Sequence, residues 1–207
     1  MAFSAYKNFG ETVKALQITY TESNFLVDVP FMPSEYFVED LAFVMREGVV
    51  DNSEFAICEN LVYPVLKEVW KSYSSQFTLW SHQFLDCGAD LSGFPEYILA
   101  RRSPLGKVVF DQPYFLLVEA KQDNFDAGWG QCLAEMVAAQ RLNETPDISV
   151  FGIVSNGDRW QFGKLVGRTL VRNQTFYSIQ SLDRLFGAVN YVFQQSALQL
   201  EQAVVAV

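Results

Sequence analysis

The stretch Tyr114-Phe115-Leu116-Leu117-Val118-Glu119-Ala120-Lys121 begins as an apolar run and ends in a carboxylate and an ammonium group two residues apart. A run of this length and composition predicts a β-strand that is buried on both faces. Residues i and i+2 of a strand point to the same side, roughly 7 Å apart, so Glu119 and Lys121 should lie together where the sheet meets solvent. Opposite charges there are costly to desolvate unless they pair or bind a ligand. The alternative is an ordinary surface ion pair, which stabilises a fold little.

The segments on either side of this strand predict more strands and one long helix. Phe77 to Cys87 and Pro95 to Ala100 have the composition of strands, and Ser103 to Pro113 is expected to be a loop. Asp126 is a plausible N-cap for a helix that ends at about Leu142. Its stripe at helical spacing, apolar until the last member, consists of Trp129, Cys132, Leu133, Met136, Val137 and Gln140.

The C-terminal part predicts a further strand, and the helix that ends at about Leu142 connects it to the strand that ends at Lys121. Ile148 to Ser155 is an apolar strand, and the Asn156-Gly157 pair that follows is a strong hairpin signal. A helix between two such strands indicates a parallel crossover, whereas the strands before it are expected to pair antiparallel. The remaining predicted elements are a return strand at 160–166, short extended segments at 169–171 and 175–179, and a helix capped by Ser181.

The N-terminal part predicts helices. Residues 35–48 form an amphipathic pattern that Ser34 would cap, and residues 54–72 form a second one that Ser53 would cap. Pro64 predicts a kink or an interruption of the second helix. A short helix at residues 11–17 is also expected. The chain as a whole is therefore predicted to be one α/β domain, a mixed β-sheet flanked by helices.

Composition and charge exclude several classes of function. The chain has 207 residues and a net charge of −9, which argues against a protein that coats nucleic acid electrostatically. Residues 1–60 carry three basic and ten acidic residues, whereas residues 101–172 carry nine and eight. The single histidine, His82, excludes sites that need two, and the three dispersed cysteines show neither a zinc nor a disulfide pattern. Residues 1–9 lack the apolar region of a signal peptide and no apolar run could span a membrane, so we expect a cytoplasmic protein with no membrane partner.

Two acidic residues are predicted to meet at the end of the central strand. Glu96 lies at the start of the preceding strand, and in an antiparallel pair the start of one strand lies beside the end of the other. Glu96 and Glu119 should therefore converge. Two carboxylates and a backbone carbonyl, that of Ala120, make an oxygen site suited to Mg²⁺, with Mn²⁺ as an alternative. Lys121 would orient a water or steady an oxyanion, and Gln131, about one turn into the next helix, would orient the site.

The pair Pro95-Glu96 followed by Glu119-Ala120-Lys121 resembles the motif of the PD-(D/E)XK nuclease superfamily, which has the restriction-endonuclease-like fold. The resemblance implies a Mg²⁺-dependent enzyme that hydrolyses phosphodiester bonds, in DNA more than in RNA. It divides the single domain at 1–207 into an N-terminal helical elaboration (1–53), a nuclease-like core (54–166) and a C-terminal strand and helix (167–207).

The resemblance also gives further residues a role. Glu59 is similar in placement to the helix acid that some members add to the metal site, and Gln131 looks like the glutamine often found after the E-x-K strand. The Asn156-Gly157 hairpin, with Trp160 and Phe162 after it, is similar to the segment that follows the core in restriction-type subunits. From the residue types alone, Glu59 is more often a solvated helix carboxylate.

One position departs from the family pattern. The first acid is usually aspartate, and here it is Glu96, whose longer side chain can still ligate a metal but would shift or loosen it. Asp86 and Asp90 are substitutes if their loop folds back. His82, in the strand before, is more often a packed or surface residue than a ligand or base.

Alternatives to an active nuclease remain open at this stage. Arg101, Arg102 and Lys107 could touch phosphates or belong to a solvated loop. The same fold could serve as an inactive module that binds a protein or nucleic acid, and the acidic, aromatic-rich chain also suits self-association as a homodimer. A third reading is a structural subunit in which Glu96 lies far from Glu119.

Overall fold

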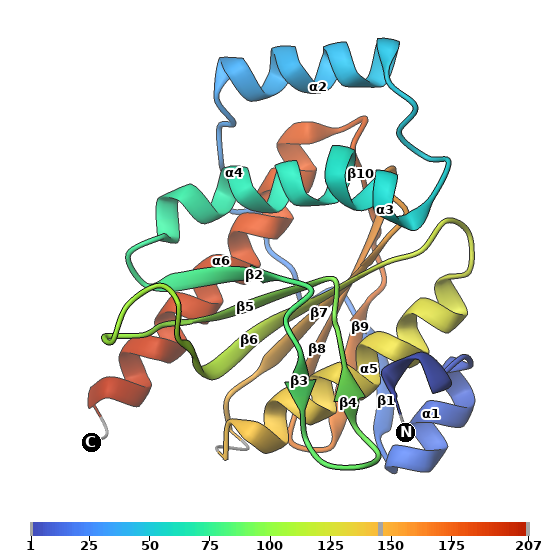
Figure 1. Ribbon diagram of the computed structural model, residues 1–207, viewed down its shortest axis with the longest axis vertical. Coiled ribbons are helices and arrows are strands. Elements are labelled where there is room, and N and C mark those ends of the chain that lie inside the picture. Colours follow the sequence, from blue (N-terminus) through green and yellow to red (C-terminus); the bar gives the residue numbers. More distant parts are fainter. Residues whose placement is uncertain (1, 145–146, 206–207) are drawn as a thin grey trace.

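The computed structural model describes residues 2–144 and 147–205 and shows an α/β fold with helices on both faces of one large mixed sheet (Figure 1). In the described residues, no helix is both long and apolar enough to cross a membrane. The helical elements are η1 (Phe3–Ala5), α1 (Phe9–Leu16), α2 (Glu35–Glu47), α3 (Glu54–Ile57), the π-helical η2 (Cys58–Val62), α4 (Tyr63–Tyr73), α5 (Phe125–Leu142) and α6 (Leu182–Val205). The strands are β1 (Thr19–Ser23), β2 (Phe77–Ser81), β3 (Leu85–Asp86), β4 (Ser92–Gly93), β5 (Tyr97–Arg102), β6 (Phe110–Ala120), β7 (Val150–Ser155), β8 (Arg159–Val166), β9 (Thr169–Asn173) and β10 (Tyr177–Ser178).

The central strand β6 lies between an antiparallel and a parallel neighbour. The main sheet has the order β1-β9-β8-β7-β6-β5-β2, with β10 pairing to β8. Strands β2, β5 and β6 form an antiparallel meander, and α5 then carries the chain to β7, which is parallel to β6. The predicted crossover is therefore confirmed. The hairpin predicted at Asn156-Gly157 is confirmed as well, since β7 and β8 are antiparallel.

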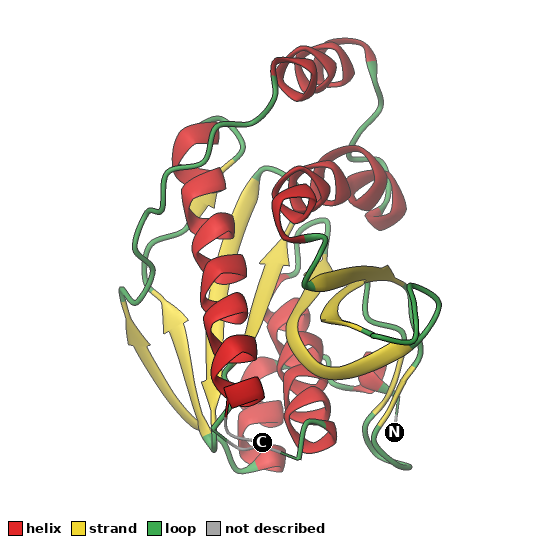
Figure 2. Cartoon of the chain, turned by 90° about the vertical axis from the view of Figure 1, so that its left-hand side faces the viewer, coloured by secondary structure: helices red, strands yellow, loops and turns green. Residues whose placement is uncertain are grey.

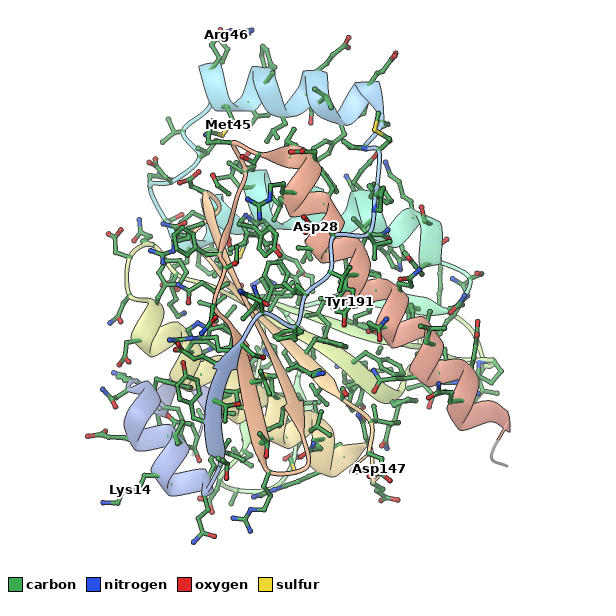
Figure 3. All side chains as sticks on the ribbon, turned by 180° about the vertical axis from the view of Figure 1, so that it is seen from behind. Lys14, Asp28, Met45, Arg46, Asp147 and Tyr191 are labelled. Carbon is green, nitrogen blue, oxygen red and sulfur yellow. The ribbon has the colours of Figure 1, made fainter. Side chains whose placement is uncertain are left out.

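Each face of the sheet is covered by its own apolar cluster. One cluster packs the β5–β8 face against η2, α4 and α6, and Figure 2 shows α6 running along this face. The other packs the opposite face against α5, with α1 and η1 beside it. Figures 1 and 3 show α2 as the outermost helix, with Arg46 directed away from the rest of the fold.

Several predicted elements change their bounds for identifiable reasons. The helix predicted at 35–48 is α2, and Ser34 caps it by accepting a hydrogen bond from the Phe37 amide at 3.2 Å. The helix predicted at 54–72 is interrupted as Pro64 suggests, because α4 begins at Tyr63, after a π-helical segment. Asn124, and not Asp126, caps α5, since its side chain accepts from the Ala127 amide.

Two other predictions were wrong in extent. The single strand predicted at 77–87 ends at Ser81, because His82 has a φ of 49°, in the left-handed region that interrupts a strand. The loop predicted at 103–113 is shorter, since β6 already begins at Phe110. A bulge between β5 and β6 lies at Leu99 to Arg101 and lets this extension stay paired.

Candidate active site at the end of the central strands

The register of β5 and β6 brings together the two acids that the sequence singles out. Tyr97 pairs with Val118, so the next step outward sets Glu96 opposite Glu119. The charge of Glu96 contributes to raising the pKa of Glu119, as expected for neighbours. Glu119 belongs to the sheet face that α5 covers, because it follows Val118, which packs on the other face. The carboxylates therefore converge at one end of the sheet.

Lys121 lies within ion-pair distance of two carboxylates. Its Nζ is 3.3 Å from Oε2 of Glu119 and 3.2 Å from Oε2 of Glu54, which comes from α3. Burial alone would lower the pKa of Lys121, but the charges of Glu119 and Glu54 outweigh it and raise that pKa. The ammonium group is therefore charged at neutral pH and held at the strand end from both sides.

Helix α5 supplies an amide and a second buried carboxyl group. Nε2 of Gln131 donates to Oε1 of Glu119 at 2.9 Å and to Oε1 of Glu135 at 3.3 Å. Both glutamates are fully buried. Gln131 thus bridges them and holds the orientation of Glu119.

Burial makes this carboxyl pair hard to ionise. It raises the pKa of Glu119 to about 7, against the lowering effects of a Glu135 hydrogen bond and of Lys121. Burial and the neighbouring Glu119 charge raise the pKa of Glu135 well above its usual range. With both groups ionised, Oε2 of Glu135 has no hydrogen-bond donor, and Oε2 of Glu119 has only the Lys121 ammonium group, 3.3 Å away. A proton on Glu135 lets the two carboxyls bond to each other, so the pair carries at most one negative charge at neutral pH.

Glu96 is engaged by residues that the sequence interpretation did not assign to the site. Nε2 of His82 lies 2.8 Å from Oε2 of Glu96, and the Cys58 thiol donates to the same oxygen at 3.4 Å. Nδ1 of His82 lies 2.8 Å from Oγ of Ser81. The register of β2 and β5 places His82 next to Glu96, since Ser81 pairs with Tyr97 and the His82 amide donates to the Glu96 carbonyl at 3.0 Å. His82 is an exposed residue, in keeping with the expectation of a surface side chain, and its imidazole also contacts Glu96.

The acidic residue of the preceding helical segment that contacts Lys121 is Glu54. Glu59 is exposed and lines a pocket of about 330 Å³ next to Glu96, together with His82 and the aromatic rings of Phe55, Tyr63 and Tyr97. The π-helical turn that contains Glu59 and Cys58 faces this pocket. Such turns widen a helix and are frequent at functional sites.

The other candidate residues lie elsewhere. The Asp86 side chain accepts a hydrogen bond from the Gly88 amide in the turn after β3. Burial raises the pKa of the neighbouring Cys87, and the charge of Arg141 opposes that rise, which places this turn near Arg141. Arg141 lies ten residues, or about 15 Å, along α5 from Gln131. Asp86 therefore does not replace Glu96. Asp90 belongs to the same hairpin, where its carbonyl accepts from the Tyr6 hydroxyl at 3.3 Å.

The basic residues of the β5–β6 connection are at the opposite end of these strands. Arg101 and Arg102 pair with Asp111 and Phe110, at the start of β6, and Lys107 is exposed in the loop. A six-residue strand is roughly 20 Å long, so these side chains cannot reach a phosphate held at Glu119.

Two residues of the site escaped the sequence interpretation although signals for them exist. Glu135 stands four residues after Gln131, which places both on one side of the helix. Glu54 directly follows the cap Ser53. Among the described residues, no three histidine, cysteine or acidic side chains are grouped so that they could hold a metal ion. Comparison of the sequence with models of known protein families and with curated proteins found no match.

Proposed function

We propose that the chain is a Mg²⁺-dependent nuclease of the PD-(D/E)XK superfamily that hydrolyses phosphodiester bonds in DNA. The observation that carries this proposal is the register of β5 and β6, which sets Glu96 opposite Glu119, with Lys121 two residues further on. The antiparallel meander followed by α5 and a parallel strand is a setting that supports a restriction-endonuclease-like fold.

The donor set fits a hard divalent cation. Glu96, Glu119 and the carbonyl of Ala120 would supply oxygen ligands, and Mg²⁺ commonly takes one or two carboxylates and keeps several waters. Oε2 of Glu119 is buried and faces the Lys121 ammonium group at 3.3 Å, so the ion would have to share this oxygen with Lys121 or displace it. Glu96 would have to exchange the His82 imidazole for the ion, since both compete for the same carboxylate.

When bound, Mg²⁺ would lower the pKa of a ligated water and offset the charge of the phosphate. Lys121 would hold that water or the developing oxyanion through its ammonium group, which Glu54 keeps in place. Gln131 would hold Oε1 of Glu119 through its amide group, so the ion would bind on the side of Oε2. Glu135 would keep a proton, because a second buried charge beside Glu119 would be costly.

A second candidate function is favoured by the same contacts of Glu96. A carboxylate that is already bonded to His82 and Cys58 has its charge partly satisfied without a metal. On this basis the chain would be a catalytically inactive module of the same fold that binds a protein or nucleic acid partner. The two candidates differ in whether Mg²⁺ binds.

Cleavage assays test the nuclease proposal directly. Single-stranded DNA, duplex DNA and RNA are incubated with the protein in Mg²⁺, in Mn²⁺ and in EDTA. We expect cutting of DNA that requires the metal, and at least a hundredfold loss in Lys121→Ala and Glu119→Gln, because each removes a group that acts at the reacting phosphate.

The controls separate this activity from contamination. Lys14→Ala removes an exposed lysine of α1 and should cut like wild type. Isothermal titration with Mg²⁺ should give binding to wild type and none to Glu119→Gln. If no substrate is cut, or if both active-site variants cut like wild type, the nuclease proposal is rejected. Absence of Mg²⁺ binding favours the inactive module.

A further inference from the structure

A second polar pocket opens beside the candidate active site, on the same face of the sheet. It has a volume of about 310 Å³ and is lined by two arginines, Arg159 of β8 and Arg172 of β9, with Gln161, Asn173 and Glu22 among the other residues. The charged groups in this lining sum to +1, two arginines against one glutamate, on a chain whose net charge is −9. This local reversal of sign indicates a site for an anion.

Arg172 is held in a fixed orientation. Its Nη2 lies 2.9 Å from Oε1 of Glu22, and its guanidinium carbon lies 5.3 Å from the Tyr20 ring centre and 5.9 Å from that of Trp129. The bond to Glu22 uses one of the five N–H groups of a guanidinium. Arg172 therefore keeps donors for a ligand and needs little reorganisation to bind one.

Arg159 has no acidic partner within ion-pair distance among the described residues. Its guanidinium carbon lies 3.8 Å from the centre of the Phe176 ring. Stacking on a ring leaves the in-plane N–H groups free to donate. Two planar guanidinium groups that face one pocket match the geometry of phosphate oxygens.

The pocket is aligned with the candidate active site across the sheet. Glu119 pairs with Val154, and Val154 pairs with Gln161, so Gln161 lies two strand spacings, or about 10 Å, from Glu119. Oε1 of Gln161 accepts from Nε1 of Trp129 at 2.6 Å, and Trp129 is two residues before Gln131 on α5. Arg159 is two residues from Gln161 and shares its face.

We propose that Arg159 and Arg172 bind a phosphate group of the nucleic-acid strand that crosses the candidate active site, next to the phosphate that is cut. This inference rests on the proposed function for the identity of the ligand. The recognised chemistry is a phosphate oxyanion, which a nucleic acid and free phosphate share, so the experiment must separate the two.

The test measures binding without cleavage. A fluorescently labelled single-stranded oligodeoxynucleotide is titrated with protein in EDTA, and anisotropy is followed at several salt concentrations. Arg159→Gln should weaken binding about 5- to 10-fold and reduce the slope of log K against log salt by about 0.7, the value for one phosphate contact with a single strand. Arg102→Gln, at the far end of β5, is the matched control and should bind like wild type.

A competition experiment identifies the source of the phosphate. Inorganic phosphate, exchanged for chloride at constant ionic strength, should displace the oligonucleotide only partly from wild type and have no such effect on Arg159→Gln. Wild-type protein that binds phosphate but no oligonucleotide overturns the assignment to nucleic acid. Equal affinity and equal salt slope for wild type and Arg159→Gln overturn the site itself.

Failure of the two proposals is distinguishable. If the protein binds the oligonucleotide through Arg159 but cuts nothing in Mg²⁺, the nuclease proposal fails and this site stands. If the protein cuts DNA and Arg159→Gln both binds and cuts like wild type, this site fails alone. Wild-type protein that binds no oligonucleotide at low salt contradicts the inference as well.

Discussion

Replacing Glu119 by glutamine should stabilise the folded protein at neutral and alkaline pH while it abolishes Mg²⁺ binding. In wild type, Glu119 is fully buried, and burial raises its pKa from 4.5 to about 7. Ionisation above that pH therefore places an unfavourable charge inside the protein. Glutamine has nearly the same shape, can accept the hydrogen bond from Gln131 and never ionises.

The magnitude follows from the pKa difference. A shift of about 2.5 units corresponds to about 3 kcal/mol. The pKa of Glu119 is higher in the folded than in the unfolded protein. The free energy of unfolding of wild type is therefore undiminished below about pH 4.5 and falls as the pH rises to about 7. The variant should therefore gain about 1 kcal/mol at pH 5.5 and about 3 kcal/mol at pH 8, as upper limits. Loss of the charge beside Lys121 reduces this gain, but Glu54 keeps the ammonium paired.

The assay is thermal unfolding of wild type and variant between pH 5.5 and pH 8. For a domain of this size each kcal/mol shifts Tm by about 2–4 °C, so we expect a difference of up to about 10 °C at pH 8. Lys14→Ala, which removes an exposed side chain of α1 far from the site, is the control, and its Tm should follow that of wild type across this pH range. A Tm difference that is the same at both pH values, or a Glu119→Gln protein less stable at pH 8, would refute the reasoning.

Three further outcomes are expected. Mg²⁺ affinity should fall about tenfold per pH unit below pH 7, because Glu119 must lose its proton to bind the ion, and calorimetry showing a constant affinity from pH 6 to 8 would contradict this. Gly157→Ala should cost about 1–3 kcal/mol in denaturant unfolding, since φ is 86° and the added Cβ would lie 2.4 Å from Leu61; an unchanged midpoint speaks against it. Asn143→Ala should cost about 2–4 kcal/mol, because Asn143 is bonded to both the amide and the carbonyl of Tyr114, at 2.7 and 2.8 Å, and wild-type stability would contradict that role.

The central part of the fold could be predicted because its local signals agree with its packing. The apolar run that ends at Ala120, the helical stripe of α5 and the Asn156-Gly157 hairpin each specify their element without help from distant residues. The antiparallel pairing then makes the approach of Glu96 to Glu119 a geometric consequence. These elements are the ones that build the candidate site.

The rest depends on long-range contacts that no local pattern carries. His82 adopts a positive φ and ends β2, and its contact with Glu96 depends on the pairing of β2 with β5. Glu54 of α3 contacts Lys121, whereas Glu59, five residues later, lines the pocket beside His82. Arg159 and Arg172 become neighbours only because β8 and β9 pair.

The parallel pairing of β1 with β9 has a consequence for how the molecule is made. Thr19 pairs with Thr169, so the two partners are separated by 150 residues, the difference between these numbers. During translation β1 leaves the ribosome long before β9 exists and must wait for it without a partner. The strands of the meander, and then β7 after α5, can pair in order as they leave the ribosome. The segment that carries Glu96, Glu119 and Lys121 therefore folds first, and β1 joins the edge of the sheet last.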